Sequence, residues 1–222
     1  MYPTIYVGKS GQKSRSWGIN LSIKKNKSRS PEISSLRIIG GRWRSRKISF
    51  TEAPGLRPTG ERIRETLFNW LAPSINGANC LDLYAGSGIL GLEALSRGAA
   101  QCTALDNNRS TTQKLQANSD LLDAKLTIIN TNCTDFLTNQ KTDIRFDVVF
   151  IDPPFAKDLH SQSCSLLEHN GWLKDDALIY CELPSNDLSF VAPANWQLQK
   201  DKIAGGVRYM LYTRFESTAQ FK

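Results

Sequence analysis

From residue 79 onward, short apolar runs alternate with amphipathic segments. The runs CLDLYA, CTALD, LTIIN, DVVFID and ALIYCEL have the length and apolar character of buried strands. The segments between them predict helices near residues 89–97, 108–120, 133–140 and 158–169. Strands that alternate with helices are typical of a parallel sheet with helices on both faces. We therefore expect an α/β fold.

The C-terminal segment departs from this alternation. NWQLQKDKIAGGVRYMLYTRF predicts two strands joined by a turn at Gly205–Gly206. An antiparallel hairpin would then close a sheet that is otherwise parallel. The expected architecture is a Rossmann-like, seven-stranded and mostly parallel sheet that ends in an antiparallel hairpin.

The chain before residue 73 predicts a smaller extension. LRIIGGRWRSRKISF indicates a hairpin with strands at 36–39 and 42–50, and ERIRETLFNWLA has the apolar spacing of a helix. Residues 1–35 are rich in Ser, Lys and Arg and show no period, which indicates a basic, disordered arm. The predicted domains are therefore the arm at 1–35, a hairpin and helix at 36–72, and the sheet domain at 73–222.

Positive charge is concentrated at the front of the 222-residue chain, whose formal net charge is +7. Residues 1–70 contain 15 Lys and Arg against 4 Asp and Glu, and residues 71–222 contain 13 against 17. A basic front on a mildly acidic body suggests a polyanionic partner. A solvated tail is the alternative, and an organelle transit peptide ranks second as an interpretation of residues 1–35 because they show no clear amphipathic helix.

Several other classes are disfavoured. No apolar run approaches the ~18 residues of a membrane span, and the first residues lack the order of a secretory signal. Five cysteines without a CxxC pair argue against a disulfide framework or a zinc site. We interpret both histidines, His160 and His169, as helix-surface residues. The expectation is a cytoplasmic protein with no metal and no membrane contact.

A glycine-rich turn follows the first strand of the predicted sheet. Gly86, Gly88 and Gly91 match G-x-G-x-x-G between a strand and a helix, where the backbone can approach a ligand. Asp82 lies four residues before Gly86, so a carboxylate faces the turn from the strand end. It suits a positively charged group and would repel a pyrophosphate. The amino group and sulfonium of S-adenosylmethionine fit, with Ser87 in the same turn, and a nicotinamide dinucleotide fits less well.

Polar residues also follow the next two strands. Asp106 ends the second strand, where an acid can bind both ribose hydroxyls of an adenosine. Both candidate cofactors contain an adenosine, so Asp106 supports a nucleoside without choosing between them. After the third strand, Asn132 or Asp135 could bind the adenine amine. We favour Asn132 because it stands just past the strand.

The fourth strand ends in FIDPPF, residues 150–155. Pro153 and Pro154 fix the backbone and remove two N–H donors. The neighbouring carbonyl and the Asp152 carboxylate are then acceptors only, and Phe155 can stack on a flat ring. Acceptors beside an aromatic platform suit an exocyclic amine on a nucleobase.

These motifs resemble known proteins. Asp82, Gly86, Ser87 and Gly88, then Asp106, then Asp-Pro-Pro-Phe at 152–155 resemble class I S-adenosylmethionine-dependent methyltransferases that act on exocyclic amines. Four segments resemble, more narrowly, a bacterial family that methylates N2 of a guanine in small-subunit (16S) ribosomal RNA. They are LRIIGGRWRSRKI, GLRPTGERIRETLFNWL, LDLYAGSGILGLEALSRGA and VFIDPPF. The resemblance runs from about Leu36 to Phe215.

The resemblance implies a methyl transfer to guanine 966, with Asp152 and the Pro153 carbonyl holding the amine. It implies ribosomal RNA as the partner, either free or in a small subunit that is assembled or being assembled, and we expect a monomer. Three alternatives stay open: an adenine-N6 methylase or a glutamine methylase with the same acceptors, a non-catalytic RNA-binding protein with the cofactor fold, and a nicotinamide-dependent reductase.

The basic residues of the predicted hairpin are candidate RNA contacts. Alternate residues of a strand share a face, so Arg42, Arg44 and Arg46 should form one row while Trp43 points into the core. Guanidinium groups suit bidentate contacts to phosphate. Arg37 and Lys47 complete the predicted RNA-binding set.

Overall fold

A computed structural model describes residues 33–51, 58–139, 144–154 and 159–215. Its main feature is one seven-stranded sheet in the order β5-β4-β3-β6-β7-β9-β8. Neighbours from β5 to β7 pair in parallel, whereas β9 pairs antiparallel with both β7 and β8. The mostly parallel sheet and its closing hairpin are confirmed. The strands are β3 (Asn79–Asp82), β4 (Gln101–Asp106), β5 (Leu126–Asn130), β6 (Phe146–Ile151), β7 (Leu173–Pro184), β8 (Trp196–Ala204) and β9 (Val207–Arg214).

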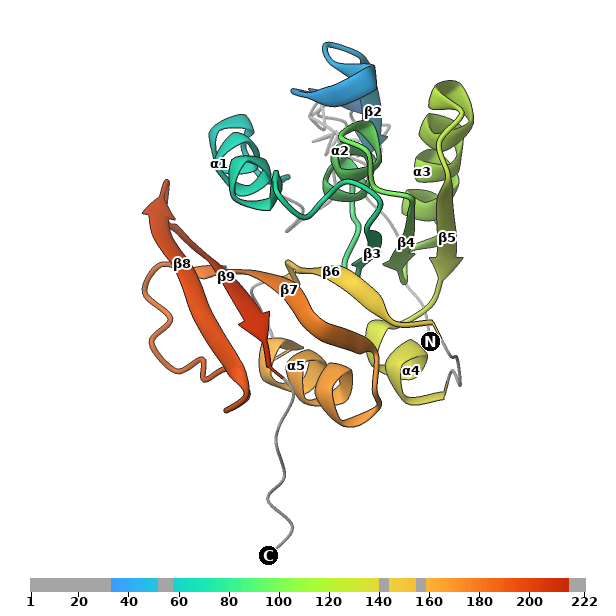
Figure 1. The fold of residues 1–222 in the computed structure, drawn as a ribbon. Helices are drawn as coiled ribbons and strands as arrows, with labels where there is room; N and C mark the ends of the chain where they lie inside the picture. The colour runs from blue at the N-terminus through green and yellow to red at the C-terminus, as the bar shows by residue number, and fades with distance from the viewer. Residues whose placement is uncertain (1–32, 52–57, 140–143, 155–158, 216–222) are drawn as a thin grey trace, which may run out of the picture. The chain divides into compact units, whose positions relative to one another are not determined.

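Helices cover both faces of this sheet (Figure 1). One face carries α1, α2 and α3, and the other carries α4 and α5. Consecutive residues of β3 alternate between the two cores, because Cys80 packs on the first face and Leu81 on the second. The helices are α1 (Glu61–Leu71), α2 (Ile89–Ser96), α3 (Arg109–Leu122), α4 (Cys133–Asn139) and α5 (Leu159–His169).

The N-terminal hairpin consists of β1 (Ile33–Arg37) and β2 (Lys47–Thr51), paired antiparallel from Ile33↔Thr51 to Arg37↔Lys47. Strand β1 therefore begins three residues before the predicted strand start at Leu36, and residues 1–32 of the predicted arm lie outside the described residues. The predicted strand at 42–50 is wrong in its first half, because residues 38–46 form a connection that contains a short 3-10 helix, η1 (Gly41–Trp43). We call residues 38–46 the basic connection.

Packing against α2 explains why the basic connection leaves the strand. The Trp43 side chain is buried, as predicted, and its backbone N–H donates to Ser96 Oγ over 3.0 Å. Ser96 Oγ in turn donates to the Gly40 carbonyl over 2.6 Å. Gly41 has φ +72°, and a Cβ there would stand 1.8 Å from the Ser96 carbonyl oxygen. The chain needs glycine at this point because only glycine allows so close an approach.

A buried charge cluster joins this connection to α1 and α2. Glu93 Oε1 accepts from Arg97 Nε over 2.8 Å, and Glu93 Oε2 accepts from the Ile39 N–H over 2.9 Å. Arg64 Nη1 lies 3.4 Å from Glu93 Oε2 and donates to the Arg37 carbonyl over 3.0 Å. Both Arg64 and Glu93 are fully buried. The cluster thus fixes the hairpin to the sheet domain.

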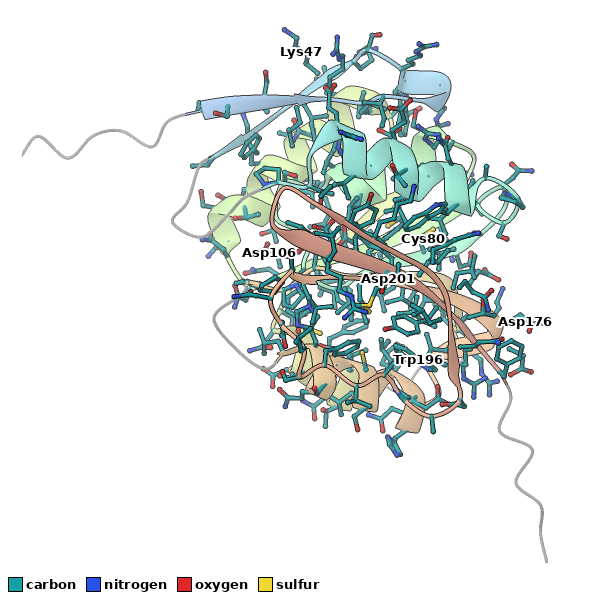
Figure 2. The ribbon with its side chains drawn as sticks, turned by 90° about the vertical axis from the view of Figure 1, so that its left-hand side faces the viewer. Lys47, Cys80, Asp106, Asp176, Trp196 and Asp201 are labelled. Carbon is teal, nitrogen blue, oxygen red and sulfur yellow. The ribbon has the colours of Figure 1, made fainter. Side chains whose placement is uncertain are left out.

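The cysteines and one of the two histidines lie in the protein interior. All five cysteines are free and buried, and Cys80 lies in the interior in Figure 2. His169 is exposed as expected, but the surface assignment of His160 is wrong. The His160 ring is 6% exposed, and its Nε2 lies 2.6 Å from the Glu182 carbonyl oxygen, so α5 is tied to β7 through it. No helix among the described residues is long and apolar enough to cross a membrane.

Candidate active site

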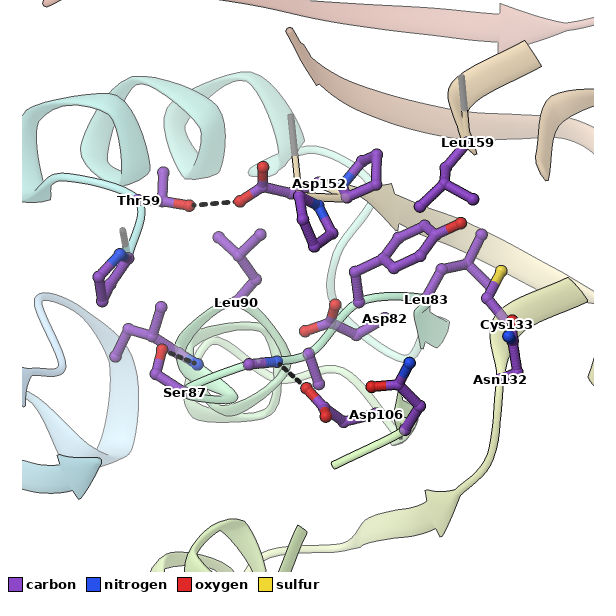
Figure 3. Close-up of a pocket in the computed structure, with 18 of the residues that line it drawn as sticks. Thr59, Asp82, Leu83, Ser87, Leu90, Asp106, Asn132, Cys133, Asp152 and Leu159 are labelled. Carbon is purple, nitrogen blue, oxygen red and sulfur yellow. Dashed lines mark hydrogen bonds between the residues drawn. The ribbon is translucent and has the colours of Figure 1, made fainter. Parts of the chain in front are cut away.

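A cavity of about 640 Å³ opens at the carboxyl ends of β3, β4 and β6 (Figure 3). In a parallel sheet, this edge is where crossover loops converge and where ligands bind. The cavity brings together most of the predicted cofactor and amine residues. Its lining includes Asp82, Gly86, Ser87, Asp106, Asn132, Asp152, Pro153 and Pro154.

The glycine-rich turn forms one wall of the cavity. Gly86 donates its backbone N–H to Asp106 Oδ2 over 3.0 Å, which ties the turn to the end of β4. Gly88 lies outside the lining and is the N-cap residue of α2, with φ +74°. A Cβ at Gly88 would stand 2.1 Å from a Leu115 methyl, so this glycine lets α3 pack closely behind the turn.

Asp106 is held by backbone donors on both oxygens. Besides the Gly86 contact, its Oδ1 accepts from the Asn108 N–H over 2.8 Å. Burial raises the pKa of the Asp106 carboxyl, and these two N–H groups partly offset that shift. Each carboxylate oxygen has a second lone pair, so the held carboxylate still presents acceptors to the cavity.

Asp82 is a nearly buried acid with an unsatisfied oxygen. Its side chain is 2% exposed, and its Oδ2 has no hydrogen-bond partner among the described residues. Burial is the largest cause that raises the pKa of Asp82 to about 7, and the N–H groups of Gly91 and Tyr84 oppose it. A buried carboxylate oxygen without a partner costs free energy until a cation or donor reaches it. Its position at the cavity wall suits a cationic ligand group.

Asn132 lies at the third strand end, on the cavity rim. Its Oδ1 accepts from the N–H and the hydroxyl of Thr134 over 3.2 and 3.0 Å, so it caps the start of α4. The amide nitrogen of Asn132 is a donor, whereas an adenine amine needs an acceptor. The lining does not include Asp135.

Asp152 lines the same cavity as Asp82 and directly follows β6. Thr59 Oγ1 donates to Asp152 Oδ2 in a long hydrogen bond of 3.4 Å (Figure 3). Burial raises the pKa of Asp152 well above its usual value, and the charges of Glu182 and Asp82 add to the shift. Pro153 and Pro154 continue the wall. Phe155 lies outside the described residues, so its stacking role stays a prediction.

Sequence reasoning missed Thr59 and Glu182. Glu182, near the end of β7, is 3% exposed and accepts the Tyr180 hydroxyl over 2.6 Å. Burial raises the pKa of Glu182, and the hydroxyls of Tyr180 and Thr59 oppose the shift. An acid inside the apolar run ALIYCEL was a visible signal for Glu182. Thr59 stands in GLRPTGERIRETLFNWL, one of the segments that carry the resemblance, but its place in the site had no local signal, because its partner Asp152 is 93 residues away.

The predicted RNA-binding residues form a separate exposed group, and none of the five lines the cavity. Arg37 pairs with Glu61 over 3.4 Å. The Arg42 guanidinium stacks 3.9 Å above the Trp43 ring, and Arg46 reaches the Leu121 carbonyl over 3.5 Å. Arg42, Arg44 and Arg46 lie in the basic connection, so the predicted single strand face is wrong. Lys47 begins β2 at the outer side of the hairpin (Figure 2).

Comparison with known sequences assigns the chain to a protein family. The family described as conserved hypothetical protein 95 matches residues 36–213. Ribosomal RNA small subunit methyltransferase D of Escherichia coli K12 is 50% identical over 180 residues, which cover 81% of this chain and 90% of the relative. The chain belongs to this methyltransferase D family. The Haemophilus influenzae member is 47% identical over 180 residues, covering 80% of this chain and 93% of the relative. The predicted family and enzyme class are confirmed.

Solved structures agree with the family assignment. The Escherichia coli protein yhhF superposes with a TM-score of 0.74 at 49% identity, over 82% of this chain and 99% of that chain. A Thermus thermophilus 16S rRNA N2 methyltransferase, solved with AdoMet and guanosine, gives a TM-score of 0.62 at 20% identity, over 83% of this chain and 51% of that chain. This second likeness concerns the fold alone. The family's Rossmann-like methyltransferase fold is therefore present in this chain.

Proposed function

We propose that this protein transfers a methyl group from S-adenosylmethionine to the exocyclic N2 of guanine 966 in small-subunit ribosomal RNA. The observation that carries the proposal is that the residues suited to the cofactor and the residues suited to an amine line one cavity. Asp82 and Asp106, the candidate cofactor residues, line it together with Asp152 and its two prolines, the candidate amine residues. The relatives' name, ribosomal RNA small subunit methyltransferase D, supports the RNA class.

The cofactor side fits S-adenosylmethionine by charge. The orphaned Oδ2 of buried Asp82 suits the ammonium of the methionine part. Asp106, held from behind by Gly86 and Asn108, would accept the two ribose hydroxyls. Asn132 would face the adenine with its amide. When bound, S-adenosylmethionine supplies a methyl group that its sulfonium already activates, and a 640 Å³ cavity can hold both reactants.

The acceptor side fits a weakly nucleophilic amine. The N2 lone pair of guanine is delocalised into the ring, so the protein must orient the amine rather than generate a new nucleophile. Asp152 and the Pro153 carbonyl would accept its two hydrogens, which favours a localised lone pair and stabilises the positive charge that develops on nitrogen. Asp152, ionised when the amine donates to it, would then take the released proton, because burial and nearby acids make its carboxylate a stronger base than a free one.

The test combines product mapping with two matched variants. Wild-type protein, labelled S-adenosylmethionine and small subunits from cells that lack the enzyme should give N2-methylguanine at position 966 by mass mapping. Asp152→Ala should keep cofactor affinity but lower turnover on the order of a hundredfold. Asp106→Ala should instead weaken cofactor binding by roughly 2–4 kcal/mol, measured by calorimetry.

Three results would contradict the proposal. A methyl group on adenine or on protein glutamine would establish one of the alternative acceptors. Preferential binding of a nicotinamide dinucleotide would reject the cofactor. Near-normal turnover by Asp152→Ala would show that another group holds the amine.

A further inference from the structure

We propose that Thr59 selects guanine over adenine by presenting an oxygen that can only accept a hydrogen bond, and that this oxygen reads the guanine N1–H. The inference rests on the proposed function and deepens it. It concerns the side chain that lies beside Asp152 in the same cavity (Figure 3). Three observations carry it: the position of the Thr59 hydroxyl, the carboxylate that accepts its hydrogen, and the contacts that hold the Thr59 backbone.

The hydroxyl of Thr59 is a neighbour of the amine site. Its Oγ1 lies 3.4 Å from Asp152 Oδ2, and both residues line the cavity. In guanine, the N1–H and one hydrogen of the 2-amino group are adjacent parallel donors on one ring edge. A base that donates the amine hydrogen on its N1 side to Asp152 turns the neighbouring ring nitrogen, N1, towards Thr59.

The carboxyl groups around Thr59 determine where its proton goes. A hydroxyl has one hydrogen to donate and two lone pairs. Here the hydrogen is donated to Asp152 Oδ2, and the same hydroxyl lowers the pKa of Glu182, so acids flank it on two sides. If the two acids share a proton, the hydrogen of Thr59 still goes to whichever carboxylate is ionised. Its oxygen then offers the cavity a lone pair and no hydrogen.

The support of Thr59 keeps the oxygen in place. The residue is 5% exposed, and its backbone carbonyl accepts from Arg64 Nε over 3.1 Å. Arg64 is itself fully buried between Glu93 and the Arg37 carbonyl. These contacts fix the backbone of Thr59, and the hydrogen bond to Asp152 orients its hydroxyl, so Thr59 cannot shift as a whole without disturbing the charge cluster beneath it.

This arrangement distinguishes the two purines that have an exocyclic amine on the pairing edge. Guanine places an N–H beside its amine, and that N–H meets the lone pair of Thr59. Adenine places an unprotonated ring nitrogen beside its amine, so two lone pairs would face each other. A site built to bind a polar hydrogen rejects a ligand that lacks it far more strongly than an apolar pocket could.

The experiment uses 2-aminopurine, which keeps the 2-amino group but has a lone pair at N1. Ribosomal RNA with either guanine or 2-aminopurine at the mapped target position is prepared in the form that the wild type methylates. The ratio of kcat/KM for the two bases is measured for wild type, Thr59→Val and Thr59→Ser. The ratio does not depend on the fraction of folded enzyme, so a partly unstable variant still gives an answer.

We expect Thr59→Val to lower the guanine preference on the order of ten- to a hundredfold, the effect of one lost hydrogen bond to a buried donor. Thr59→Ser keeps the hydroxyl and should keep the preference. Thr131→Val is the matched control, because Thr131 lines the cavity on the cofactor side, and its hydroxyl donates to the Asn132 carbonyl at 3.4 Å.

The outcomes separate this inference from the proposed function. If the wild type makes N2-methylguanine and Thr59→Val keeps the wild-type preference, the role of Thr59 is overturned while the function stands. If Thr59→Ser loses the preference as fully as Thr59→Val, side-chain shape rather than the oxygen decides, and the inference is again overturned. If the wild type does not methylate guanine N2, both proposals fail.

Discussion

Asp82, Asp152 and Glu182 place three carboxyl groups in or beside one cavity, and burial raises the pKa of each. None of the three forms an ion pair with a cation among the described residues. Such acids lower the stability of the unliganded protein when they ionise. A cationic amino group and N–H donors relieve that cost, so the residues that weaken the empty site are the ones that favour the proposed ligands.

The raised pKa of Asp82 predicts a pH dependence for cofactor binding. In the free protein this pKa is about 7, and a bound ammonium would favour the ionised carboxylate. Below pH 7, binding must therefore remove a proton from Asp82, so affinity should rise with pH up to about 7. Above about pH 8 it should fall as the ligand's own amino group loses its proton. Calorimetry in buffers of different ionisation enthalpy measures the released proton.

Asp82→Asn is the control for that experiment. It should bind more weakly at every pH and release no proton on binding. The stability of the unliganded protein has the opposite pH dependence. Because the pKa of Asp82 is raised, its contribution to stability is greatest below its ordinary pKa and is lost as the pH rises through about 7. A wild-type affinity that stays flat between about pH 5 and pH 7 would show that Asp82 does not contact the ammonium.

At this scale the sequence revealed the residues whose neighbours carry a pattern. Asp82 and Asp106 were found from strand ends near a glycine-rich turn, and Asp152 from the prolines after it. His160 was misjudged because its partner, the Glu182 carbonyl, lies 22 residues away on a different element. Thr59 was missed for the same reason. Contacts between distant segments leave no trace in a local window of sequence.

At the scale of elements, the N-terminal hairpin and α1 are held to the sheet domain by charge as well as by apolar packing. Removing one member of a buried ion pair leaves the other charge uncompensated, which costs about 3–5 kcal/mol. Glu93 serves three donors from three segments, namely Arg64, Arg97 and the Ile39 N–H. Its loss should therefore loosen the hairpin, α1 and α2 together.

We predict that Glu93→Gln lowers the free energy of unfolding by about 3–5 kcal/mol in urea titrations. Arg64→Met should cost about 3 kcal/mol, at the lower end, because Glu93 keeps Arg97 as a partner. The matched control is Asp201→Asn, which breaks the pair with Arg208 on the exposed β8–β9 hairpin and should cost about 0–1 kcal/mol. Equal losses for Glu93→Gln and Asp201→Asn would contradict a stabilising role for the buried cluster.

The alternation of strands and helices was predicted correctly from residue 79 onward because each element has its own periodic pattern. The conformation of the basic connection was predicted wrongly, because GGRWRSRK has the alternation of a strand. Tertiary packing decided its conformation: Trp43 is buried, and Gly40 and Gly41 lie against the end of α2. Local propensity gives way where a large aromatic side chain can reach a core.

At the scale of the whole molecule, the exposed cations of the hairpin remain the best candidates for phosphate contact, although they do not form one strand face. Changing three of them should weaken RNA binding and reduce the slope of log affinity against log salt by about 2, since each phosphate contact contributes ~0.7–0.9. The variant spares Arg42, which stacks on Trp43, and consists of Arg44→Ala, Arg46→Ala and Lys47→Ala. Filter binding across a salt series measures both quantities.

The control for this variant removes the same charge elsewhere. Three exposed cations serve the purpose: Lys125 between α3 and β5, Arg145 just before β6, and Lys200 on β8. Their loss should leave the salt slope unchanged if the hairpin is the RNA-binding surface. A similar drop in slope for both triple variants would instead indicate diffuse attraction by net charge.

The five buried cysteines make the protein its own reporter of local opening. Cys80 and Cys102 belong to the core on one face of the sheet, and Cys133, Cys164 and Cys181 belong to the core on the other. Burial raises the pKa of Cys80 to about 12, so the native thiol is inert to alkylation and reacts when its surroundings open. Alkylation under native conditions, followed by mass spectrometry, would therefore measure the rate at which each face of the sheet opens, with no engineered probe. Coincident labelling of all five thiols would identify the sheet and both helical layers as a single cooperative unit.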